Sequence, residues 1–174
     1  YSEYGVEPDL VSLGKGLGNG MPVDAVVGRA DVFARLSFGE GSDTWSGHPL
    51  GCAAVLATLD EFEQTDVLEQ GRRLSVAIEE NLVKLNELPA IHAVRGEGTV
   101  WGIECEAVGQ LSADEVAAEI VRLCYLGDEE GRGVHLLGPL AGKVIRVAPP
   151  LTMPVAELQE YFDVVHRLVA NLGR

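Results

Sequence analysis

The sequence predicts an α/β protein whose C-terminal part has an α+β arrangement. Stretches rich in β-branched residues alternate with stretches of helical periodicity along the whole chain, and no segment repeats. A length of 174 residues, with 47% hydrophobic and 23% charged residues, is typical of a globular protein with a buried core. No apolar run approaches the roughly 18 residues that span a bilayer, so a membrane partner is not expected.

Composition also argues against several other partners. Acidic residues outnumber basic ones by 27 to 13, and binding to nucleic acid needs clustered Lys and Arg instead. Cys52, Cys105 and Cys124 show no C-x-x-C spacing, which predicts reduced, mostly buried thiols in a cytoplasmic protein. The four histidines lie far from one another in the sequence, so no metal site is expected.

Two short strands are predicted near the N-terminus, at residues 10–13 (LVSL) and 23–28 (VDAVVG). Between them lies a glycine-rich turn that contains a single lysine, Lys15. Pro22 prevents a helix from running through this turn. Residues 38–46 are rich in Gly, Ser and Asp, which predicts a loop.

Two helices are predicted to follow this loop. The first begins near Pro49, a residue that the first helical turn tolerates, and continues through the small residues after it. The second covers about 66–88 and ends before Pro89. Its apolar stripe consists of Val67, Leu68, Leu74, Ile78, Leu82 and Leu85.

The remaining chain predicts strands mixed with two further helices. Ser112, with Glu115 three residues later, has the pattern of a capping box at a helix start. The predicted elements are strands at 91–98, 99–106, 134–137 and 143–148, a helix at 113–126, and a final helix from about Pro154 to Leu172.

Lys15, among Gly14, Gly16 and Gly18, is the main candidate for chemistry. A P-loop requires Ser or Thr directly after the lysine, where this chain has Gly16. A dinucleotide fingerprint requires a third glycine, which is missing from both possible alignments, and a following helix, which Pro22 disfavours. Two interpretations stay open: a lysine that forms a Schiff base with an aldehyde, and an ordinary lysine in a surface turn.

Four segments in order resemble the class III pyridoxal-phosphate aminotransferases, in their C-terminal portion only. They are residues 4–22 (YGVEPDLVSLGKGLGNGMP), 44–54 (TWSGHPLGCAA), 94–98 (VRGEG) with 102–104 (GIE), and 145–152 (IRVAPPLT). The resemblance implies a fold type I protein: a remnant of its large domain, at 1–60, and a C-terminal small domain, at 61–174. It also implies a homodimer that transfers an amino group from an amine or amino acid to a 2-oxo acid.

The resemblance implies roles for four residues of this chain. Lys15 would form the Schiff base with pyridoxal phosphate and move a proton. Thr44 would hold the cofactor phosphate in the neighbouring subunit's site, with Ser42 as a lesser candidate. Arg146 would receive a substrate carboxylate, and a structural salt bridge is the alternative for this residue.

We expect this chain to be a fragment, since its first residue is Tyr1 and it shows no counterpart of three elements of the family. These are the phosphate-cradling loop, the ring-stacking aromatic, and the aspartate that pairs with the ring nitrogen. An inactive fragment of an active parent is therefore expected. The alternatives are a non-catalytic association module, or an aminomutase or decarboxylase of the same family.

Overall fold

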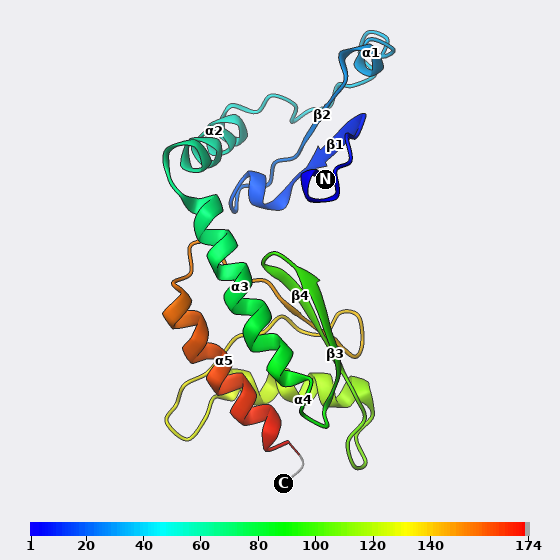
Figure 1. Ribbon diagram of the computed structural model, residues 1–174. Coiled ribbons are helices and arrows are strands. Elements are labelled where there is room, and N and C mark those ends of the chain that lie inside the picture. Colours follow the sequence, from blue (N-terminus) through cyan, green and yellow to red (C-terminus); the bar gives the residue numbers. More distant parts are fainter. Residues whose placement is uncertain (173–174) are drawn as a thin grey trace. The chain divides into compact units, whose positions relative to one another are not determined.

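The computed structural model describes residues 1–172, and the chain divides into two compact units, with the boundary between Asp66 and Val67 (Figure 1). The boundary expected from the sequence, between residues 60 and 61, falls inside helix α2, which runs over Pro49–Gln64. The helix continues because nothing in residues 60–64 breaks it. It ends at Thr65, whose hydroxyl donates to the Glu61 carbonyl at 2.7 Å.

The N-terminal unit is built on a two-stranded antiparallel sheet. Strands β1 (Leu10–Leu13) and β2 (Ala25–Gly28) pair with Leu10 opposite Gly28 and Leu13 opposite Ala25. The unit also contains three short helices and the long helix α2. The short ones are η1 (Ser2–Tyr4), η2 (Lys15–Leu17) and α1 (Ala30–Phe33).

This unit buries little apolar surface. None of the large hydrophobic side chains in residues 1–66 is buried, and Trp45 (73% exposed), Leu56 (61%) and Val27 (57%) are largely open to solvent. Two-stranded sheets are marginally stable by themselves in water. The N-terminal unit therefore lacks the buried apolar area on which an independent domain depends.

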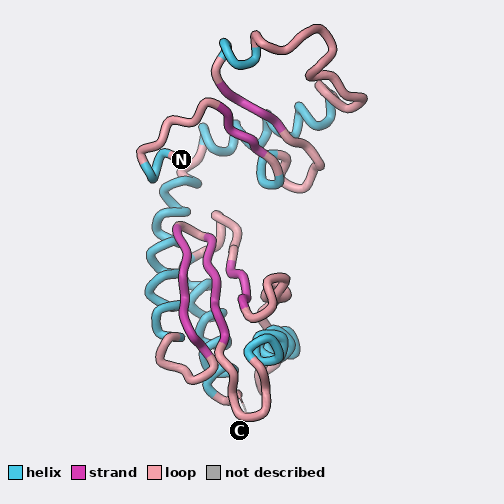
Figure 2. The backbone as a smooth tube through the Cα atoms, turned by 90° about the vertical axis from the view of Figure 1, so that its right-hand side faces the viewer, coloured by secondary structure: helices cyan, strands magenta, loops and turns pink. Residues whose placement is uncertain are grey.

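A three-stranded antiparallel sheet organises the C-terminal unit, in the order β3–β4–β5 (Figure 2). The strands are β3 (Ile91–Glu97), β4 (Val100–Cys105) and β5 (Val144–Val147). Three helices pack with it: α3 (Val67–Leu85), α4 (Ala113–Leu126) and α5 (Val155–Ala170). The predicted capping box is confirmed, because Ser112 and Glu115 exchange hydrogen bonds at the start of α4.

The core of the C-terminal unit lies between the helices and one face of the sheet. Trp101, Ile103 and Cys105 alternate as buried residues along β4, as the two-residue period of a strand requires. The apolar stripe of α3 supplies fully buried Leu74, Ile78 and Leu82, and α4 and α5 complete the cluster. The opposite face of the sheet carries Gly102, Glu104 and Arg146.

Two expectations from the sequence are corrected. Residues 134–137 do not form a strand: Leu137 makes only an isolated bridge to Arg146. The Val134 N–H donates to the Cys124 carbonyl in the last turn of α4, which removes it from any strand pairing. Leu68, expected on the apolar stripe of α3, is 54% exposed. The thiols are mostly buried, as expected: Cys105 and Cys124 are buried, and Cys52 is exposed because it lies on α2 in the unit that lacks a core.

Candidate functional site

Lys15 lies two residues after the end of β1, at the start of η2. Its φ is +48°, in the left-handed region that residues with a side chain rarely adopt. The turn is held by backbone bonds from Leu17 to Gly14 (3.0 Å) and from Gly18 to Lys15 (3.2 Å). Such backbone conformations cost about 1–3 kcal/mol and persist only where the surrounding structure holds them. They are found most often at functional sites. Lys15 is exposed, and within residues 1–172 no ion pair or side-chain hydrogen bond engages its amine.

The glycines around Lys15 serve different purposes. A Cβ at Gly18 would lie 2.2 Å from the Met21 carbonyl oxygen and 2.5 Å from a Val23 methyl group, so only glycine fits there. A Cβ at Gly16 would meet no atom within 4 Å, so this position leaves open space beside the lysine. Gly18 thus allows two parts of the turn to approach each other closely, and Gly16 leaves the space beside Lys15 empty.

The loop that carries Ser42 and Thr44 is organised by Asp43. One oxygen of its carboxylate accepts the backbone N–H groups of Trp45 (2.7 Å) and Ser46 (2.8 Å), and the other accepts the Ser46 hydroxyl (2.7 Å). These bonds, the Ser46 hydroxyl first, lower the pKa of Asp43. Ser46 is therefore engaged within the loop, whereas the Ser42 and Thr44 hydroxyls are exposed and make no described hydrogen bond in this part of the chain.

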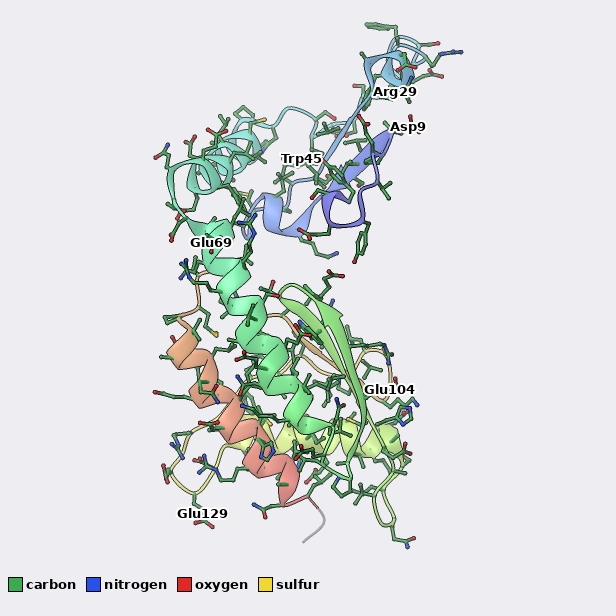
Figure 3. All side chains as sticks on the ribbon, in the orientation of Figure 1. Asp9, Arg29, Trp45, Glu69, Glu104 and Glu129 are labelled. Atoms are coloured by element: carbon green, nitrogen blue, oxygen red, sulfur yellow. The ribbon has the colours of Figure 1, made fainter. Side chains whose placement is uncertain are left out.

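His48 also contributes to this loop, although the sequence predicted no role for it. Its Nδ1 accepts the Gly51 N–H at 3.2 Å and so caps α2 ahead of Pro49. Its ring also packs edge-on against Trp45, with the centroids 5.2 Å apart. A polar side chain directly before a helix-starting proline is the signal that could have identified this cap. His48 thereby anchors the loop of Thr44 to the helix. Trp45, its ring partner, is labelled in Figure 3.

Lys15, Ser42 and Thr44 all belong to the N-terminal unit, where η2 and α2 are in contact. No described hydrogen bond within residues 1–66 joins the lysine to either hydroxyl. Arg146 belongs to the C-terminal unit and lies on β5, with its side chain on the exposed face of the sheet. Over the described residues, no carboxylate forms an ion pair with it.

A cavity of about 340 Å³ lies in the C-terminal unit between residues 133–137, residues 146–150 and helix α5. Tyr161 lines it, and its hydroxyl donates to the Glu157 carboxylate at 2.6 Å, which raises the pKa of Tyr161. The lining is otherwise mostly apolar. No group of His, Cys, Asp and Glu in residues 1–172 is arranged to hold a metal ion. No helix in this range is long and apolar enough to cross a membrane.

Comparison with known proteins places the chain in a family. The model of the family "Aminotransferase class-III" matches residues 1–169. The chain belongs to the class III aminotransferases, and the recognition made from its four motifs is confirmed.

The chain is similar to curated proteins with two kinds of activity in their names. It is 33% identical to the acetylornithine aminotransferase of Bacillus subtilis, over 98% of this chain and 41% of that protein. It is 31% identical to a leucine/methionine racemase of Thermococcus litoralis, over 97% of this chain and 38% of that protein. The chain therefore spans about two fifths of the length of the curated relatives that it matches.

Solved structures agree with this assignment. The acetylornithine aminotransferase of Elizabethkingia anophelis has a TM-score of 0.75 and 26% identity, over 97% of this chain and 40% of that structure. The fold class expected from the sequence, an α/β protein that represents part of the fold type I architecture, is confirmed.

Proposed function

We propose that this chain is the lysine-bearing C-terminal part of a pyridoxal-phosphate-dependent aminotransferase. The parent protein would move an amino group from an amine or amino acid to a 2-oxo acid. The observation that carries this proposal is the family match over residues 1–169, which includes a lysine in a strained turn at a strand end. Residues 1–60 are assigned to the large domain and 61–174 to the small domain, near the division of the structure at Asp66.

The residues present fit the cofactor chemically. Lys15 offers an exposed amine without an ion-pair partner in the described chain, and Gly16 keeps the space beside it open. Thr44 and Ser42 offer exposed hydroxyls on a loop whose conformation Asp43 and His48 hold, and hydroxyls are suitable donors to a phosphate. When bound, the cofactor supplies a conjugated ring that accepts the negative charge released at the substrate Cα.

The chain's own residues then have three tasks. The Lys15 amine would hold the cofactor and would carry a proton to and from the substrate Cα. Thr44 donates to the phosphate in the neighbouring subunit's site of a homodimer, with Ser42 as the lesser donor. Arg146 binds the substrate carboxylate, for which its planar guanidinium provides two parallel N–H donors.

Reduced Cys52, Cys105 and Cys124 support a cytoplasmic location.

The test combines borohydride reduction with peptide mapping of the parent protein. We expect reduction in the presence of pyridoxal phosphate to attach the cofactor permanently to Lys15, and Lys15→Ala to abolish transamination. Lys84→Ala is the matched control, because Lys84 is engaged with Asn81 on α3 and has no proposed part in the chemistry. Normal turnover in the Lys15→Ala variant with its cofactor bound would refute the proposal. For the 174-residue chain alone we expect no turnover, because its N-terminal unit is incompletely packed.

A racemase is the second candidate, because one relative carries that name. The two reactions differ in their need for an acceptor. An aminotransferase converts a single amino-acid enantiomer only when a 2-oxo acid is supplied, whereas a racemase inverts it without one. Chiral chromatography of the parent protein's reaction, with and without 2-oxoglutarate, separates the two.

A further inference from the structure

A row of three residues crosses the exposed face of the C-terminal sheet. Gly102 on β4 lies opposite Arg95 of β3 on one side and opposite Arg146 of β5 on the other. Directly paired residues present their side chains on the same face of a sheet, so the two arginines flank a position that has no side chain. A Cβ at Gly102 would lie 3.1 Å from a Val144 methyl group.

Glu104 lies two residues further along β4, on this same face, and Figure 3 labels it there. It is diagonal to both arginines, and diagonal neighbours in an antiparallel sheet are within reach of long side chains. Its carboxylate is held by two cations: Oε2 accepts from Arg95, and Oε1 pairs with the Lys143 amine at 2.7 Å. The Glu104 side chain is only 14% exposed.

The pairing of Glu104 is selective. Arg146 is on the same face and is also diagonal to Glu104, yet Glu104 is bonded to Arg95 and Lys143. The hydrogen bonds from Arg95 and then Lys143 also lower the pKa of Glu104 to about 2, so the carboxylate stays ionised at neutral pH. Freed from either cation, it would be an anion beside an unpaired guanidinium, and the two would attract each other.

We propose that Arg95 and Lys143 are positioning residues that keep Arg146 available to a carboxylate ligand, by holding both oxygens of Glu104. Without them, Glu104 pairs with Arg146 and competes with the ligand. This inference rests on the proposed function only for the role of Arg146 as a carboxylate receptor. The restraint on Glu104 itself concerns the folded C-terminal unit alone.

The first test observes the guanidinium of Arg146 by NMR in the 174-residue chain. It does not depend on this chain having enzymatic activity. In Arg95→Met, which removes the charge and keeps most of the stem, we expect the Arg146 Nε–H resonance to shift and its exchange with water to slow. In the double variant Arg95→Met/Glu104→Gln, both quantities should return to their original values. An unchanged Arg146 signal in Arg95→Met overturns the proposal.

Two further variants keep this test independent of folding. Lys143→Met releases the other oxygen of Glu104 and should shift Arg146 in the same direction, so it carries the test if Arg95→Met does not fold. Arg122→Met is the matched control, since Arg122 pairs with Glu119 on α4 through two bonds of 2.6 and 2.7 Å. It should leave the Arg146 signal unchanged, and a shift in this control would indicate a general structural effect and overturn the proposal.

The second test uses steady-state kinetics of the active parent holoenzyme. If Glu104 occupies Arg146 for half to four fifths of the time in Arg95→Met, KM for 2-oxoglutarate rises by about two- to fivefold. We expect kcat, and KM for an amine donor without a carboxylate, to stay unchanged, and Glu104→Gln to rescue the acceptor KM. If KM for 2-oxoglutarate is unchanged although the Arg146 NMR signal shifts, the proposal that Arg95 and Lys143 keep Arg146 available to the substrate carboxylate is overturned. Absence of any turnover in the unmodified parent overturns the proposed function instead.

Discussion

Shortening the buried side chain of Ile78 tests where the stability of this chain resides. Ile78 lies on α3 with 0% exposure, in the core of the C-terminal unit. Ile78→Val removes one carbon, worth about 0.8 kcal/mol in transfer free energy, and Ile78→Ala removes three, worth about 2.4 kcal/mol. Adding the cost of an unfilled cavity, we expect losses of about 1 and about 3–4 kcal/mol in the free energy of unfolding.

Urea unfolding followed by tryptophan fluorescence measures these losses. Trp101 is 8% exposed in the C-terminal unit, whereas Trp45 is 73% exposed in the N-terminal unit. In a Trp45→Phe background, the fluorescence therefore reports the C-terminal unit alone. With an m-value of about 1–2 kcal/mol per molar urea, a loss of about 3 kcal/mol lowers the midpoint by about 1.5–3 M, with m unchanged.

The control lies on the same helix. Val76 is 57% exposed, so Val76→Ala should change the free energy of unfolding by no more than about 0.5 kcal/mol. Equal losses for Val76→Ala and Ile78→Ala would refute the reasoning, because burial would then not determine the cost. A loss below about 1 kcal/mol for Ile78→Ala would also refute it.

Three other predictions concern the cap, the charged sheet face and the turn. Ser112→Ala should cost about 1 kcal/mol of unfolding free energy in urea titrations, because it removes the cap of α4. Since the pKa of Glu104 is about 2 in the folded chain against an ordinary 4.5, its stabilisation is complete above pH 4.5 and is lost as the pH falls toward 2. Glu104→Gln should therefore flatten the fall in stability between those pH values, and an unaltered pH profile would contradict this. Gly18→Ala should displace the amide resonances of the turn at Lys15, whereas Gly16→Ala, which adds a methyl group in open space, should leave them nearly unchanged.

Much of the secondary structure could be predicted because its signals are local. The stripe on α3 and the capping box at Ser112 depend on residues within a few positions of one another. The structure has both, except that Leu68 of the stripe is exposed. The strand expected at 134–137 was wrong because its apolar residues have no local feature that distinguishes pairing in a sheet from packing beside one. The Val134 N–H bond to α4 decides the outcome, and its partner is ten residues away.

The candidate site likewise has some features that the sequence predicts and others that only the tertiary structure determines. The sequence alone supplied the order of the four motifs, and with it the family and the candidates Lys15, Ser42, Thr44 and Arg146. Only the tertiary structure decided that Lys15 has a positive φ and that Arg95 and Arg146 flank Gly102. Strand register and backbone strain arise from pairing between distant segments, and no short stretch of sequence contains that information.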